Sequence, residues 1–215
     1  MSYTIREEGL GEYTEKKSVF TGRICPCSSE AEARQYIEGI RKQERTARHH
    51  VFAYVIGEKN QIVRYSDDGE PQGTGGLPVL NVLTQHGLTD VCLVVSRFFG
   101  GILLGAPGLT RAYGKAAADA AASVTHWQVI QGAAFMVTLP YDLHARLKSF
   151  LSELQVTQTD FSQSVTLHLL TTEEEVDGVM AELTNQTQGQ AIFSEVTAGR
   201  YFLNKDGMLE PVDQD

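Results

Sequence analysis

Apolar and polar positions follow two different periods along this chain, and the period changes several times within the first half. The wholly apolar run Val91–Val95 is typical of a strand that is covered on both faces. Ser29 and Glu32 have the spacing of a capping box, so they predict a helix that begins there and extends to about Glu44. Pro78 suits the first turn of another helix. For this first domain we predict a sheet with helices on one side.

The strands predicted for the first domain are Tyr13–Arg23, Val51–Ile56, Gln61–Tyr65, Val91–Val95 and Thr125–Gly132, and the helices are Ser29–Glu44, Pro78–Gly87 and Thr110–Ser123. The second half predicts strand, helix, strand, strand, helix and strand, in that order, at Phe135–Pro140, Leu143–Leu154, Val156–Phe161, Val165–Leu170, Val176–Leu183 and Ala191–Phe202. This βαββαβ order is the split motif of a ferredoxin-like domain. We therefore predict an α+β protein with domains at residues 1–130 and 133–203 and a tail at 204–215.

Composition is that of a globular protein, with 42% hydrophobic residues in 215, and the net charge of −9 is placed unevenly. Residues 1–132 hold 14 Lys and Arg against 14 Asp and Glu, whereas residues 133–215 hold 4 against 13. Because phosphate binding depends on clustered cations, we expect the acidic C-terminal domain not to bind nucleic acid broadly. The balanced N-terminal domain can still carry a local basic patch.

Three cysteines predict neither a disulfide framework nor a metal site. Cys25 and Cys27 are too close in sequence for an ordinary bridge, and Cys92 lies inside the apolar run. The N-terminal segment has no apolar stretch of the kind found in signal peptides, and no run reaches the ~18 apolar residues of a membrane span. We expect a cytoplasmic protein with no membrane partner.

A cluster of carboxylates at Asp67, Asp68 and Glu70 allows two interpretations. These residues can form a metal-binding or acid/base group, or they can build a tight turn in which aspartates accept backbone N–H groups. We favour the turn, because no second acidic or histidine cluster is close in sequence. His49 can be a general base or an anion donor, or a hydrogen-bonded structural residue, and we leave both interpretations open.

Two glycine-rich segments, Gly73–Pro78 and Gly105–Thr110, precede predicted helices. Such segments can offer converging N–H groups and the positive end of a helix dipole to an anion, or they can serve close packing. Neither fits a nucleotide-binding motif, so we assign no cofactor. Arg97 ends the apolar strand, and Arg111 and Lys115 follow one turn apart at the predicted start of the next helix. These three cations favour an anion site, with a phosphate of RNA as the expected ligand.

The motifs around these residues resemble those of the IMPACT/YigZ family. The residues that carry the resemblance are Lys17-Ser18-Val19-Phe20, Ala47-Arg48-His49, Asp67-Asp68-Gly69-Glu70-Pro71, Gly73-Thr74-Gly75-Gly76, Arg97-Phe98-Phe99-Gly100-Gly101 and Gly108-Leu109-Thr110-Arg111-Ala112-Tyr113. Gly75 stands where the family usually has alanine, and Pro107 stands where it usually has glycine, which removes one N–H donor. Some sixteen residues precede the first motif, so we expect no counterpart of the extra N-terminal domain of eukaryotic members.

The resemblance implies a fold and a role. It implies a first domain like domain 2 of ribosomal protein S5, followed by the ferredoxin-like domain, as in domains IV and V of elongation factor G. It also implies a non-enzymatic, translation-associated regulator that binds RNA, the ribosome or a ribosome-associated partner. The residues expected to bind are Lys17, Arg97, Gly100, Gly101, Gly105, Gly108, Arg111 and Lys115. The alternative is a small-molecule hydrolase that uses His49 with Asp67, Asp68 or Glu70.

Overall fold

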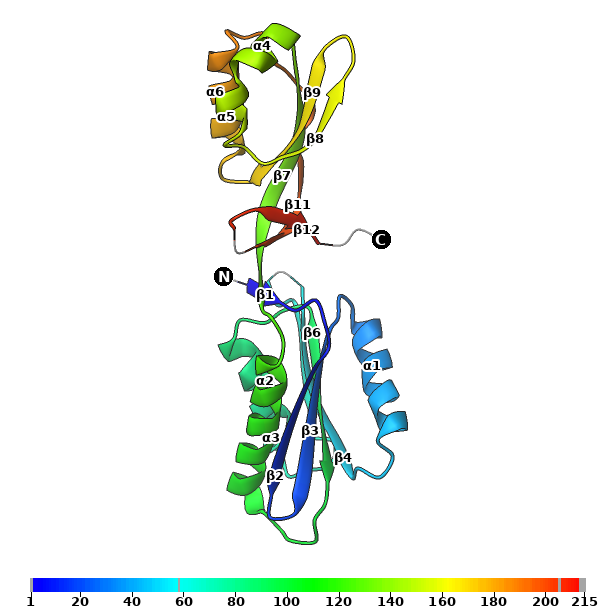
Figure 1. The fold of residues 1–215 in the computed structure, drawn as a ribbon. Helices are drawn as coiled ribbons and strands as arrows, with labels where there is room; N and C mark the ends of the chain where they lie inside the picture. Colours follow the sequence, from blue (N-terminus) through cyan, green and yellow to red (C-terminus); the bar gives the residue numbers. More distant parts are fainter. Residues whose placement is uncertain (1, 58, 205, 213–215) are drawn as a thin grey trace. The chain divides into compact units, whose positions relative to one another are not determined.

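The computed structural model describes residues 2–57, 59–204 and 206–212. It divides into two compact units, Met1–Trp127 and Gln128–Asp215. Each unit has a sheet and helices, so the protein is of the α+β class, as predicted (Figure 1). Among the described residues, no helix has both the length and the apolar composition needed to cross a membrane.

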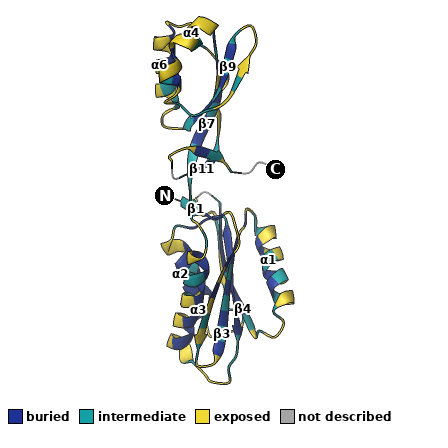
Figure 2. Ribbon diagram, viewed as in Figure 1, coloured by how far each residue is buried: buried dark blue, intermediate teal, exposed yellow. Residues whose placement is uncertain are grey.

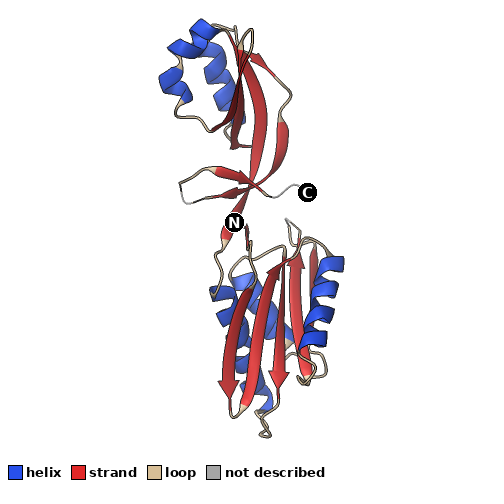
Figure 3. Ribbon diagram, turned by 45° about the vertical axis from the view of Figure 1, so that its right-hand side comes forward, coloured by secondary structure: helices blue, strands red, loops and turns tan. Residues whose placement is uncertain are grey.

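The sheet of the first unit has the strand order β2-β3-β6-β4-β5, and every neighbouring pair is antiparallel (Figure 3). Its strands are β2 (Gly9–Glu15), β3 (Ser18–Pro26), β4 (His49–Ile56), β5 (Ile62–Ser66) and β6 (Val91–Phe98), and a short strand β1 (Ser2–Thr4) precedes them. The central strand β6 is buried from Val91 to Arg97. A side chain at the end of β6 therefore lies inside the unit.

Helices cover both faces of this sheet, so the prediction of helices on one side is wrong. Helix α1 (Glu30–Gln43) packs on one face through Ala33, Ile37 and Ile40, and α2 (Gly76–Gln85) and α3 (Gly105–Ala122) pack on the other. Successive residues of β6 alternate between the two cores, which confirms that this strand is covered on both faces. Figure 2 shows the strands between the helices mostly in dark blue and the outer sides of the helices in yellow.

Two sequence-based boundaries are wrong for reasons of backbone geometry. The predicted strand Tyr13–Arg23 is a hairpin, because Lys16 and Lys17 adopt positive φ values of 46° and 68° and turn the chain between β2 and β3. Helix α3 begins at Gly105, five residues before the predicted start at Thr110. The proline at position 107 is compatible with this start, since the first turn of a helix needs no N–H there.

Alanine and glycine bring α3 unusually close to β2 and β3. A Cβ atom at Gly11 would lie 2.3 Å from the backbone nitrogen of Ala120, and one at Gly22 would lie 2.5 Å from the carbonyl oxygen of Ala116. Ala116 and Ala120 are themselves fully buried. The helix backbone therefore rests directly on the strand backbone, which only glycine permits at these positions.

The second unit follows a βαββαβ order in which the first helix is divided into α4 and α5 and the last strand into β10 and β11, with β12 added at the end. Its sheet order is β12-β11-β7-β9-β8, and β10 also pairs with β7. Its elements are β7 (Trp127–Leu139), α4 (Tyr141–Arg146), α5 (Lys148–Leu151), β8 (Val156–Phe161), β9 (Val165–Thr172), α6 (Val176–Gln186), β10 (Ile192–Phe193), β11 (Thr197–Leu203) and β12 (Leu209–Pro211). Helices α4 to α6 cover a core that includes Phe135, Val137, Leu167 and Leu183.

Several predicted segments of this unit differ from the structure. The predicted helix Leu143–Leu154 is divided into α4 and α5. Two separate strands are predicted at Thr125–Gly132 and Phe135–Pro140, but the structure has one continuous strand, β7, across both. Residues 128–139 pair without interruption with β11 or β9. The predicted last strand Ala191–Phe202 is divided into β10 and β11. In the predicted tail, residues 205 and 213–215 lie outside the described residues, and Leu209–Pro211 pair with β11.

The close contact between α3 and the sheet leads to a prediction about stability. We expect Gly22→Ala to lower the free energy of unfolding by about 1–3 kcal/mol, because the added methyl group overpacks a rigid backbone contact. The matched control is Gly39→Ala in α1, where a Cβ atom meets nothing within 4 Å. It should raise stability by about 0.5–1 kcal/mol through better helix propensity. Urea unfolding of both variants tests this, and equal effects would contradict the packing argument.

Candidate functional site

The Asp67 carboxylate organises the first glycine-rich loop from within. Its Oδ2 accepts the N–H of Gly73 at 2.8 Å, and its Oδ1 accepts the N–H groups of Gly75 and Gly76 at 3.0 and 2.9 Å. Burial raises the pKa of Asp67, but these three hydrogen bonds outweigh it and leave the pKa below its ordinary value. The donors expected to bind an external anion at Gly73–Pro78 are therefore occupied by a side chain of the same loop.

The neighbouring Asp68 joins this loop to β4 and α1. Its φ of 46° is left-handed, which a tight turn requires. Its carboxylate accepts the N–H of His50 at 2.6 Å and a guanidinium N–H of Arg41 at 2.8 Å, and its carbonyl oxygen lies 2.8 Å from Nδ1 of His49. Both aspartates are thus committed to the turn that was favoured for them.

Glu70 is enclosed and holds a buried polar cluster together. Its Oε1 accepts a hydrogen bond from Nη1 of Arg97 at 2.7 Å and one from the hydroxyl of Tyr113 at 2.8 Å. Burial, followed by the charge of Glu70, raises the pKa of Tyr113 far above its ordinary value. Arg97 is only 5% exposed and lies next to the rings of Phe20 and Phe99. Arg97 was expected to bind an external anion, but its Nη1 is bound by a carboxylate of the same unit.

His49 stands at the edge of this cluster in a defined orientation. A carbonyl oxygen only accepts hydrogen bonds, so the contact with Asp68 requires the proton on Nδ1 of His49. The other nitrogen, Nε2, lies 3.9 Å from Oε1 of Glu70. In the neutral ring Nε2 is therefore a free acceptor that faces a carboxylate, and in the protonated ring it is a donor.

These groups form one wall of a pocket of about 340 Å³ at the start of α3. His49, Glu70 and Arg97 supply its polar wall, and Phe99, Leu104 and Leu109 are among its apolar lining. Arg48 lies at its edge, with its guanidinium 4.7 Å from the ring centre of Phe99. Leu103, also in the lining, is 82% exposed. The site thus combines fixed polar atoms with an apolar surface that solvent reaches.

The three cations expected to meet at an anion site lie in different environments. Arg97 is buried, whereas Arg111 and Lys115 are exposed on α3. Lys115 forms an ion pair with Asp119. Arg111 lies beside Tyr13 of β2. A hydrogen bond to Glu15 raises the pKa of Tyr13, and the charge of Arg111 lowers it by less. Arg111 and Lys115 were expected at the start of this helix, but α3 begins at Gly105, so neither cation is in its first turn.

The remaining expected binding residues form the loop between β6 and α3 and the turn that packs on it. A Cβ atom at Gly100 would lie 2.0 Å from the carbonyl carbon of Lys17, and the N–H of Gly100 donates to Oγ of Ser18. Gly101 and Gly105 have positive φ values of 84° and 70°, and Gly108 is buried in the helix. Packing or backbone conformation therefore explains why glycine stands at these positions. The side chain of Lys17, in contrast, is exposed.

Two residues of the site were not identified from the sequence. Tyr113 was noted only as part of a motif, but it is fully buried and its hydroxyl donates a hydrogen bond to Glu70. Arg48 was noted only as part of a motif, although its contact with Phe99 places it at the pocket. Arg48 and Phe99 lie far apart in sequence. Only the position of both residues next to strand β6 could have indicated their contact.

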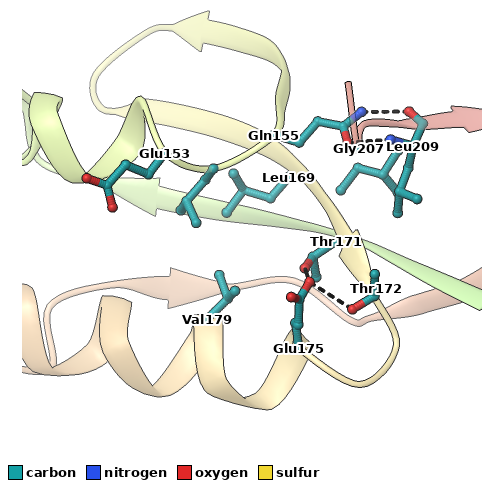
Figure 4. A pocket seen from close by; sticks show the side chains of 11 residues that line it. Glu153, Gln155, Leu169, Thr171, Thr172, Glu175, Val179, Gly207 and Leu209 are labelled. Atoms are coloured by element: carbon teal, nitrogen blue, oxygen red, sulfur yellow. Dashed lines mark hydrogen bonds between the residues drawn. The ribbon is translucent and has the colours of Figure 1, made fainter. Parts of the chain in front are cut away.

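The second unit contains a pocket of about 260 Å³, and several of its polar side chains form hydrogen bonds within the unit (Figure 4). The amide of Gln155 exchanges two hydrogen bonds with the backbone of Leu209, and the hydroxyls of Thr171 and Thr172 both donate to Glu175. This arrangement fastens β12 to the unit. Among the described residues, no group of three His, Cys, Asp or Glu side chains could hold a metal ion.

The role of Asp67 leads to a prediction about pH. We expect Asp67→Asn to lower the free energy of unfolding at neutral pH by about 2–3 kcal/mol, because the amide cannot accept all three N–H groups. A carboxyl with a lowered folded pKa contributes its full stability above the unfolded pKa, near 3.8, and loses it as pH falls through the folded value. The difference between wild type and variant should therefore shrink below that pH.

Urea unfolding from about pH 7 down to about pH 2 measures this difference. The control is Asp119→Asn, which removes only an exposed ion pair with Lys115 and should cost less than about 1 kcal/mol. A loss for Asp67→Asn no larger than that of the control would refute the assigned role.

Comparison with known proteins places the chain in a family. The family model described as the Impact N-terminal domain matches residues 16–121, and a domain of unknown function, DUF1949, matches residues 137–190. The chain is similar to IMPACT family member YvyE of Bacillus subtilis (35% identity, covering 90% of each chain) and to YigZ of Escherichia coli (30%, covering 81% of this chain and 87% of that one).

More distant matches cover less of the chain. Protein IMPACT-A of Xenopus tropicalis is 32% identical over 97 residues, which cover 43% of this chain and 30% of that protein. A crystal structure described as a hypothetical protein aligns with a TM-score of 0.59 at 27% identity and covers 89% of this chain and 95% of that one. The two domain matches and the extended similarity to YvyE and YigZ show that the chain belongs to the IMPACT family.

Proposed function

We propose that the first unit binds RNA of the ribosome, or a ribosome-associated partner, in a regulatory role that involves no catalysis. The observation that carries the proposal is a set of exposed cations next to the loop between β6 and α3. Lys17 lies in the turn that packs against Gly100, Arg48 lies over Phe99, and Arg111 projects from α3 beside the same hairpin. None of the three cations forms an ion pair in the part of the chain that the structure describes.

Free cations on rigid backbone suit a phosphate chain better than a single small anion. The backbone of Lys17 is fixed by a left-handed turn and the guanidinium of Arg48 lies over an aromatic ring, and neither side chain has a carboxylate partner in the described chain. Cations of this kind release counterions when they meet phosphates, and this release supplies most of the affinity in sequence-independent binding. The exposed Leu103 and half-buried Phe99 next to them offer apolar surface on which a base can stack.

The hydrolase alternative has one observation in its favour, namely that His49 and Glu70 share a pocket at 3.9 Å. The other two carboxylates considered for it are bound by backbone N–H groups and by Arg41. The thiols of the three cysteines are buried, and burial raises the pKa of Cys27 to about 12, which disfavours a thiolate nucleophile. A binding role therefore fits the arrangement better.

The proposal includes the two fold assignments implied by the family resemblance. The βαββαβ order of the second unit and its central strand pair β7 and β9 support a ferredoxin-like assignment. The order β2-β3-β6-β4-β5 with helices on both faces is the arrangement to be compared with domain 2 of ribosomal protein S5. A pairing of these folds as in elongation factor G, and a cytoplasmic location, are part of the same proposal.

The proposed function predicts a change in salt dependence. We expect Lys17→Gln and Arg111→Gln each to weaken RNA binding and to lower the slope of log K against log salt by about 1, since each removes one phosphate contact. The control is Arg34→Gln on α1, an exposed cation already paired with Glu30 on the opposite face of the sheet. Fluorescence anisotropy with a labelled ribosomal RNA fragment over a series of salt concentrations measures both quantities. Identical slopes for wild type and all three variants would exclude this surface.

A further inference from the structure

The pocket at the start of α3 contains a donor and an acceptor that no protein atom uses. Glu70 receives both of its hydrogen bonds on Oε1, and Arg97 gives its bond to Glu70 from Nη1. Oε2 of Glu70 and Nη2 of Arg97 have no partner in the described chain, and neither is among the side-chain atoms that are both enclosed and unpaired. Both residues line the pocket and are more than nine-tenths buried. Both atoms are therefore open to a polar partner from outside the chain.

Backbone donors lie in the same pocket. Helix α3 has no side-chain cap, and the N–H groups of Gly105 and Ala106 donate to no acceptor in the described part of the chain. The first N–H groups of a helix point out of its end, where the dipole also favours negative charge. Pro107, which follows, has no N–H to add. Gly105 and Ala106 line the pocket together with Arg97, so an anionic group placed there would meet donors from two elements.

These features define the chemistry of a ligand. The anionic group belongs between the start of α3 and Arg97, a hydrogen-bond donor belongs next to it against Oε2 of Glu70, and an apolar body belongs against Phe99, Leu104 and Leu109. We propose that this pocket binds an apolar amino-acid residue with a free carboxylate and an adjacent N–H, either a free amino acid or the C-terminal residue of a peptide. The volume of about 340 Å³ is in the range of small-ligand sites.

The pocket shares Arg48, Phe99 and Leu103 with the surface proposed to bind RNA, whereas the exposed side chains of Lys17 and Arg111 are not part of its lining. Glu70 and Arg97 have opposite charges, so the ligand needs both an anionic group and a hydrogen-bond donor. An anion alone would meet the free carboxylate oxygen, and a cation alone would meet the guanidinium and the helix end. A molecule that carries a carboxylate and a donor side by side satisfies both.

Four probes that differ by one group test the proposal with the full chain. They are L-phenylalanine, N-acetyl-L-phenylalanine, 3-phenylpropionate, which lacks the N–H, and L-phenylalaninamide, which lacks the carboxylate. We expect at least one of the first two to bind at least about tenfold more tightly than the last two, because each of these leaves a buried group of the protein unpaired. Preference for the free amino acid or for the N-acetylated one identifies the source of the ligand.

The site of binding is read from amide resonances in NMR titrations of the wild-type chain. We expect the N–H signals of Gly105 and Ala106 to shift with the tighter probes. Ala106→Pro removes one donor at a position where proline is tolerated and should weaken the same probes, whereas Ala31→Pro, at the corresponding position of α1, should not. Equal binding of all four probes, shifts confined to other residues, or no binding by any probe would overturn the proposal.

Discussion

The buried contact of Glu70 with Arg97 and Tyr113 is the interaction on which the site depends. It joins the acidic turn, the end of β6 and the middle of α3, three segments that no other side-chain cluster connects in the described chain. Placing a carboxylate and a guanidinium inside a unit costs desolvation, which their attraction offsets only with good geometry. Truncation of either partner would leave the other charge buried and alone. The pair therefore specifies one arrangement of these segments more than it stabilises the fold.

The three carboxylates of the acidic motif, Asp67, Asp68 and Glu70, have different roles around this contact. Asp67 satisfies the N–H groups of the glycine loop, Asp68 fixes His49 and Arg41, and only Glu70 reaches the pocket. A motif that resembles a metal or acid/base cluster in sequence is thus a folded turn with one buried member that lines the pocket. The same turn sets which nitrogen of His49 carries the proton, so the chemistry of the pocket follows from backbone geometry several residues away.

The sequence was informative where a pattern is local. The apolar run of β6 and the N-cap of α1 at Ser29 follow from neighbouring residues, and the structure contains both, although Glu32 accepts the N–H of Ser28 instead of that of Ser29. The βαββαβ order is also local, and the second unit contains it with its first helix and last strand each divided in two. Prediction was wrong where a distant contact decides. The turn at Lys16 and Lys17 has no glycine to signal it, and the start of α3 at Gly105 follows a glycine with positive φ rather than a capping side chain. The burial of Arg97 could not be predicted, since its partner lies 27 positions away.

The contact of α3 with the two glycine-containing strands has a consequence for the entropy of folding. Gly11, Gly22, Ala116 and Ala120 have no side-chain rotamers, so the contact at these four positions orders no side chain. The cost appears instead in the backbone, where glycine loses more freedom than any other residue. Dispersion between two backbones at short range must then offset it. At these positions α3 is held to the sheet by contacts between backbone atoms. Substitutions on the outward side of α3 therefore leave this contact unchanged.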